Sequence, residues 1–217
     1  MTATTIPEIG NRRKDRILRY AGRSVLDIGC GDGRWVGALL HYQYQIYGID
    51  AAPRPYGPEV AQHIFKADAC HLPFKDESFD TVLMTNVLEH LDDEAALSEA
   101  YRICRKNVIF SVPSHEQEEE LGEYNLIYSA YGDPTHLRHY GIERICSTFA
   151  STGFEIREIA FEGPISPFGL FLRSLRLPRR LTFVAGAFVN KLPGVRKYYM
   201  NIEGVAAKNA LFAEKHE

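Results

Sequence analysis

A glycine-rich turn constrains the fold of this chain more than any other feature. The stretch SVLDIGCGDGRW (residues 24–35) places Gly29, Gly31 and Gly33 directly after an apolar segment. Glycines at a strand-to-helix turn let the backbone approach a ligand closely, and the amino end of the following helix favours negative charge. The stretch therefore predicts a buried strand, a tight ligand-binding turn and a helix, as in a nucleotide-binding α/β protein.

Segments of strand and helix character alternate along the chain. Strand-like segments cover residues 24–29, 45–51, 64–69, 79–86, 107–113, 154–161 and 201–209, and helix-like segments cover residues 11–22, 33–44, 94–104 and 141–153. This alternation predicts parallel βαβ units in a doubly wound sheet, which is an α/β fold. The 217 residues suffice for one domain, with a loop-rich insert at 114–138 and a further insert at 163–200.

Composition excludes several classes of protein. The net charge of −3 indicates no nucleic-acid partner. The four cysteines form no CxxC pair, which argues against a zinc ribbon or a disulfide scaffold. The amino-terminal residues have no signal-peptide pattern, and no run of 18 apolar residues is present. We therefore expect a cytoplasmic protein with reduced thiols.

Acidic residues around the glycine turn indicate which nucleotide it holds. The dinucleotide fingerprint G-x-G-x-x-G needs a glycine where this chain has Arg34. Asp27, two residues before the first glycine, would repel a pyrophosphate but suits the ammonium and sulfonium of S-adenosylmethionine (SAM). These residues favour SAM over NAD. Asp50, at the end of the second strand, can accept both ribose hydroxyls, and Asp68 with the amide of Ala69 can bind adenine, unless Asp68 only caps a turn.

The motifs in this order resemble those of the class I SAM-dependent methyltransferases of the small-molecule branch. The segments VLDIGCGDG, YGID and KADACHLPFKDESFDTVLMTNVLEHL carry the resemblance, together with a late GF before a strand, and it spans residues 25–159. The resemblance implies a Rossmann-like, seven-stranded sheet that is mostly parallel with an antiparallel last strand. It implies SAM as cofactor, S-adenosylhomocysteine (SAH) as product, and the following cofactor-binding residues: Asp27, Gly29, Cys30, Gly31, Asp50, Ala51, Asp68, Ala69 and Asn86.

Histidines gather in the segments that follow the predicted strands. We expect His90, His115, His136 and His139 on one rim, because the ligand of an open α/β sheet lies at the carboxyl ends of its strands. Tyr128, Tyr131 and Tyr140 accompany them on the acceptor-side insert. Histidine can remove a proton from an acceptor hydroxyl. The candidate bases are His139, ranked first, then His136 and His90, and the alternative is that each only hydrogen-bonds its own loop.

A metal site is the competing interpretation of the same region. NVLEHL resembles the E-x-x-E-H element of metal-dependent O-methyltransferases that act on quinols and small RNAs. Asn86 replaces the first glutamate, while Glu89 and His90 remain and His115 or Glu116 would complete the site. A divalent ion would lower the pKa of a bound hydroxyl. The missing carboxylate weakens this interpretation, and we expect no metal.

The segment at 163–200 is basic and amphipathic. Its cations are Arg173, Arg176, Arg179, Arg180, Lys191, Arg196 and Lys197, with no acidic residue among them. The apolar side chains of PFGLFLRSLRLP recur at helical spacing, which predicts helices inserted before the last strand. Such helices suit an anionic acceptor or peripheral contact with the anionic inner face of a membrane, and the alternatives are a solvated basic face or a dimer contact.

The residues together predict an enzyme that methylates a small or glycan-like acceptor, most readily at oxygen. The acceptors we expect are small molecules and lipid-linked or nucleotide-linked sugars. Two alternatives stay open: a subunit that binds SAM or SAH without catalysis, and the metal-dependent quinol-type enzyme.

Overall fold

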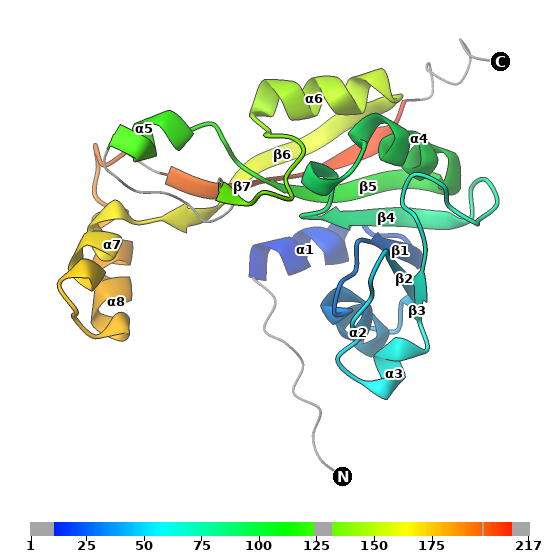
Figure 1. Cartoon of the computed structure of the whole chain (residues 1–217), viewed down its shortest axis with the longest axis horizontal. Helices are drawn as coiled ribbons and strands as arrows, with labels where there is room; N and C mark the ends of the chain where they lie inside the picture. Colours follow the sequence, from blue (N-terminus) through cyan, green and yellow to red (C-terminus); the bar gives the residue numbers. More distant parts are fainter. Residues whose placement is uncertain (1–10, 124–131, 197, 210–217) are drawn as a thin grey trace.

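The structure, a computed structural model, describes residues 11–123, 132–196 and 198–209. Seven strands form one sheet in the order β3-β2-β1-β4-β5-β7-β6 (Figure 1). The strands are β1 (Ser24–Ile28), β2 (Gln45–Asp50), β3 (Ile64–Lys66), β4 (Phe79–Thr85), β5 (Cys104–Pro113), β6 (Phe154–Ile165) and β7 (Tyr198–Lys208). Because β7 runs antiparallel to both β5 and β6 while β1 to β5 are parallel, the predicted mixed sheet is confirmed.

Helices cover both faces of the sheet. One face carries α4 (Asp93–Ile103) and α6 (Ile142–Ser151), and the other carries α1 (Asn11–Tyr20), α2 (Arg34–His41) and α3 (Pro58–Ala61) (Figure 1). Alternate residues of the central strands serve the two layers: Met84 packs in the core beneath α4 and α6, whereas Leu83 packs in the core with α1 and α2. Strands buried on both faces need apolar residues at every position, which is why they were recognisable as continuous apolar runs.

Several short elements were not predicted. They are α3, the 3-10 helix η1 (Leu88–His90) and α5 (Glu118–Glu123), each six residues or fewer. Elements this short have too few turns for a helical period to show in the sequence. Within the segment at 163–200 the structure has α7 (Pro167–Ser174) and α8 (Arg179–Val189), between strands β6 and β7. Tyr128 and Tyr131 lie outside the described residues. No helix of the described part of the chain is both long enough and apolar enough to cross a membrane.

A buried ion-pair network fixes α1 to the antiparallel strands. Arg16 lies 2.7 Å from Glu203 on β7 and 2.9 Å from Glu158 on β6, and Arg13 also binds Glu203. Tyr20 donates to Glu158 at 2.8 Å. Charges out of water stay stable only when their partners are in place. The network therefore sets the position of α1, whose Arg13 lines one cavity together with Gly29 and Gly31 of the predicted turn.

We predict that Arg16→Met lowers the free energy of unfolding by about 3 kcal/mol, because it leaves the buried carboxylate of Glu203 with Arg13 alone and removes the guanidinium from Glu158. Arg12→Met is the matched control: its guanidinium is 78% exposed and meets Glu162 at 3.5 Å, so the loss should stay below about 1 kcal/mol. Urea unfolding measures both. Equal losses in the two variants would contradict the role given to Arg16.

Candidate functional site

The glycine turn is held in left-handed backbone by close contacts. Gly29, Gly31 and Gly33 have φ of 72°, 54° and 82°. A Cβ on Gly29 would lie 2.3 Å from a methyl of Val87, in the loop after β4, so the two loops approach as closely as glycine permits. A Cβ on Gly31 would meet nothing within 4 Å. Its backbone therefore faces open space, which is what a turn that cradles a ligand requires.

Asp27 lies beneath this turn without a partner. The residue is 1% exposed, and neither carboxylate oxygen has a hydrogen-bond partner among the described residues. Burial, and next the charge of Asp50, raises the pKa of Asp27 to about 8. A buried carboxyl group with free oxygens is costly unless something compensates it. A cationic ligand in the turn would do so, and the ammonium of SAM fits this arrangement.

Asp50 ties the end of β2 to the glycine turn. One carboxylate oxygen accepts the N–H of Gly31 at 2.9 Å, and the other accepts the N–H of Ala52 at 2.8 Å. Each oxygen keeps a lone pair, so the carboxylate can still accept from ribose hydroxyls. Asp50 and the next residue, Ala51, line one cavity. Asp50 thus orders the turn as well as offering a ligand contact.

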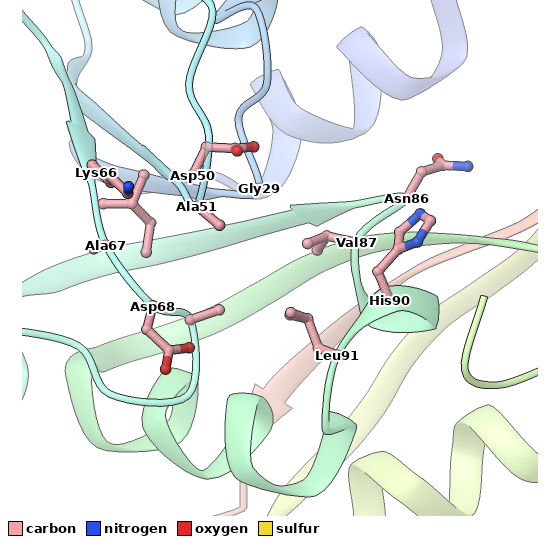
Figure 2. Close-up of a pocket in the computed structure, with 12 residues that line it drawn as sticks. Gly29, Asp50, Ala51, Lys66, Ala67, Asp68, Asn86, Val87, His90 and Leu91 are labelled. Carbon is pink, nitrogen blue, oxygen red and sulfur yellow. The ribbon is translucent and has the colours of Figure 1, made fainter. Parts of the chain in front are cut away.

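Asp68 forms hydrogen bonds within its own loop. Its carboxylate accepts the N–H of Cys70 at 2.9 Å and lies 3.1 Å from Nδ1 of His71. The Cys70 bond is the main reason why the pKa of Asp68 is lowered. Figure 2 shows the carboxylate turned away from Asp50 and the glycine turn. Ala69 is buried on the cavity wall, so in this structure the backbone of this loop, more than the Asp68 side chain, faces the cavity.

Two adjoining cavities meet at Gly29 and Asn86. One, of about 760 Å³, contains Gly29, Asp50, Ala51, Asp68, Ala69 and Asn86 in its wall, and the other, of about 580 Å³, contains Cys30 and Gly31 (Figure 2). Eight of the nine predicted cofactor residues therefore line one trough, with Asp27 behind it. The volumes are in the range of sites that enclose a nucleotide-sized ligand. Asn86, at φ 53°, is fixed by accepting from the hydroxyl of Ser111 at 3.0 Å.

Several wall residues were missed from the sequence. Val87, Leu91 and Ile49 give the larger cavity an apolar lining, and Arg13 of α1 reaches the smaller one. Arg13 also donates to Ser111 at 2.9 Å. The basic run NRRKDR was the available signal for Arg13, but its position beside the turn depends on the pairing with Glu203, 190 residues away.

The four histidines form two ring pairs that lie near each other. The rings of His90 and His136 meet edge to face at 4.7 Å, beside the buried Glu89. The rings of His115 and His139 stack at 3.9 Å, beside Glu118. Within the described residues only His90 of these four lines either cavity, so the structure separates it from His139, the first-ranked candidate base.

Hydrogen bonds fix the tautomer of His90. Its Nδ1 lies 3.2 Å from the carbonyl oxygen and 3.1 Å from the hydroxyl oxygen of Thr135. The carbonyl can only accept, and the hydroxyl proton is directed to Asp133 at 2.6 Å. Both contacts therefore require Nδ1 to carry the proton, which leaves the lone pair on Nε2.

Comparisons with known proteins agree with this geometry. A methyltransferase-domain family model matches residues 26–112. A probable SAM-dependent methyltransferase of Mycolicibacterium smegmatis is 28% identical over 151 residues, which cover 64% of this chain and 55% of that protein. The chain therefore resembles class I SAM-dependent methyltransferases over the part that carries the cavity walls. A demethylmenaquinone methyltransferase of Lactiplantibacillus plantarum is 36% identical over 95 residues, covering 37% of this chain and 40% of that protein.

The fold of the methyltransferase domain has solved counterparts. The crystal structure of a SAM-dependent methyltransferase from Archaeoglobus fulgidus superposes with a TM-score of 0.62 at 22% identity, covering 91% of this chain and 92% of that one. The chain spans about half the length, or less, of the two curated relatives above. SAM is the cofactor that these similarities imply, and the residues that would hold it are the glycine turn, Asp27 and Asp50.

We predict that Gly31→Ala weakens SAH binding at least tenfold, because the new methyl group enters the open side of the turn. Gly194→Ala is the matched control: Gly194 also has a left-handed φ, of 80°, and open space around it, but lines neither cavity. Both variants should lose a similar stability, about 1 kcal/mol, from the strained backbone. Calorimetric titration with SAH measures the affinities. Unchanged binding by Gly31→Ala would contradict the cradle.

Proposed function

We propose that this protein is an O-methyltransferase that uses SAM to methylate a hydroxyl group of a small-molecule acceptor. The observation that carries the proposal is His90 on the cavity wall with its lone pair on Nε2. When bound, SAM supplies an activated methyl group on a sulfonium. Placement of the acceptor accounts for most of the acceleration, and removal of the hydroxyl proton for the rest.

The chain's own residues divide this work. His90 accepts the hydroxyl proton at Nε2 while Thr135 and Asp133 hold its Nδ1–H. Burial lowers the pKa of His136, so this neighbour stays neutral and adds no repulsion. Glu89 has one atom within 4.8 Å of a nitrogen of His90, and burial raises its pKa to about 7. Its carboxylate form stabilises the imidazolium that proton transfer creates.

The cavity wall and one relative support a class of acceptor. The larger cavity is mainly apolar, with Val87, Leu91 and Ile49 among its lining residues. Quinols, lipid-linked sugars and nucleotide-linked sugars all present a hydroxyl on a ring. The demethylmenaquinone methyltransferase among the relatives supports a quinol. The apolar wall is compatible with both lipid-soluble acceptors, which are quinols and lipid-linked sugars. Incubation with tritium-labelled SAM and each acceptor class tests the proposal, and transfer of label to a quinol or sugar hydroxyl supports it.

We predict that His90→Gln lowers kcat by roughly 10²- to 10⁴-fold, the usual contribution of a general base. SAH affinity should stay within about twofold, because His90 lies across the cavity from Asp50, which would hold the ribose (Figure 2). His139→Gln is the matched control and should lose less than about tenfold in kcat. Steady-state rates with the labelled product measure both. The reverse order of the two losses would return the role to His139.

A metal-dependent reaction is the second candidate function. Ligand atoms of Glu89, His90 and His136 lie within 4.8 Å of one another. One carboxylate oxygen of Glu89 and Nδ1 of His136 are buried and have no hydrogen-bond partner among the described residues. These atoms suit a divalent ion. We expect activity to survive EDTA, and loss of activity that manganese or magnesium restores would favour this candidate instead.

A subunit that binds SAM or SAH without catalysis is the remaining alternative. It shares the glycine turn, Asp27 and Asp50 with an enzyme, so binding alone does not separate the two. Tight SAH binding without label transfer to any acceptor class, by wild type and His90→Gln alike, would favour the binding subunit.

A further inference from the structure

The helical hairpin formed by α7 and α8 carries an exposed apolar surface. The side chains of Phe183 and Phe188 are 75% and 66% exposed, and Val184, Leu181 and Leu175 are exposed as well. Residues 181–189 contain no charged side chain. Several large apolar side chains exposed on one short helix normally mark a contact with something apolar.

The hairpin is packed with its small residues inside. Gly186 faces Ser166 and Gly169, where an added Cβ would come within 3.1 Å of both residues, and Thr182 is 1% exposed. The large side chains of α8 point outward instead. In a helix pair in water, the large apolar side chains pack between the helices. In lipid, small residues lie between the helices and large apolar side chains face the acyl chains, and the hairpin has this second distribution.

The charge of the hairpin has one sign. The described residues from Pro167 to Arg196 include Arg176, Arg179, Arg180, Lys191 and Arg196, and no acidic residue occurs between Glu162 and Glu203. Arg196 pairs with Glu120 at 2.6 Å, and the others lie at the two ends of α8. An apolar helix face flanked by cations is complementary to a surface with apolar chains below anionic headgroups.

The sheet topology brings this hairpin to the side of the cofactor site. Strand β6 runs antiparallel to β7, which runs antiparallel to β5, so β6 is parallel to β1 and β4. Its carboxyl end, from which α7 continues, therefore lies at the same edge as the glycine turn and Asn86. Figure 1 shows the hairpin projecting beyond the sheet at that edge.

We propose that the α7–α8 hairpin docks this protein on the surface of an anionic lipid bilayer. The helix α8 has 11 residues and is about 16 Å long, far shorter than the hydrocarbon core, so it lies along the interface with Phe183, Val184 and Phe188 in the acyl region. The basic residues at its ends contact headgroup phosphates. The cavity edge then faces the membrane, from which a lipid-soluble acceptor can enter. The docking itself does not depend on the methyl-transfer proposal.

Vesicle co-sedimentation tests the docking. Wild-type protein should sediment with vesicles of equal parts phosphatidylglycerol and phosphatidylcholine at low salt, and binding should fall steeply at higher salt or with phosphatidylcholine alone. Arg176→Glu/Arg180→Glu should weaken binding by at least about 30-fold, because each of the two lost cations near an anionic surface contributes about 1 kcal/mol and the new carboxylates add repulsion. Phe183→Glu/Phe188→Glu should abolish sedimentation by removing the apolar contact.

Matched controls separate docking from general effects of charge. Lys75→Glu/Arg23→Glu makes the same charge change, with Arg23 just before the amino end of β1, and Phe65→Glu places a charge on an exposed phenylalanine of β3. Both control variants should bind vesicles within about threefold of wild type, because their substitutions lie outside the hairpin. All variants should keep SAH binding, which verifies their fold.

Two sedimentation results would overturn the proposal. One is failure of wild type to sediment with anionic vesicles, and the other is binding by both hairpin variants that equals that of wild type. A wild-type dimer without lipid that Phe183→Glu/Phe188→Glu converts to monomer would also overturn it, because a second copy would then cover the face.

Discussion

The contact between Gly29 and Val87 is the constraint on which the site depends. It presses the turn after β1 against the loop after β4, with no room for a side chain. The N–H groups of Gly29 and Cys30 both bond to the carbonyl of Ile49, which joins β2 to the same point. Three parallel strands thus end together, and the unpartnered carboxyl group of Asp27 is sealed beneath them. The meeting of these strand ends forms the trough above Asp27, and the buried carboxyl group beneath it favours a cationic ligand.

The elements that could be predicted are those whose signal is local. Strands buried on both faces, such as β1, β4 and β5, appear as continuous apolar runs, and the turn appears as three glycines. The position of Asp50 also followed, because it depends only on the length of one strand. The orientation of Asp68 did not follow, since it is set by the competing N–H of Cys70 and by His71.

The ranking of the histidines could not be derived from the sequence for a related reason. His90 meets His136 and Thr135 across some 45 residues, and His139 stacks on His115 instead. These contacts depend on how a long loop returns over η1, for example through the bond from the N–H of Leu137 to the carbonyl of Glu89. A spacing in the sequence carries no information on which pairs form. The hairpin of α7 and α8 was the opposite case, because its charge and apolar pattern are local.

Buried Asp27 makes the turn a site for a cationic cofactor, and this role has a direct signature in proton release on SAH binding. Burial holds the pKa of Asp27 at about 8 in the free protein, so at pH 7 the group is mainly protonated. An ammonium nearby favours the carboxylate, so binding should release close to one proton, and affinity should rise with pH up to about 8 and then level off. Titration calorimetry at pH 7 in two buffers of different ionisation enthalpy measures this release. Wild type should release close to one proton and Asp27→Asn none, with weaker SAH binding by that variant. No release by wild type, or equal release by both proteins, would show that Asp27 does not prepare the turn for a cation.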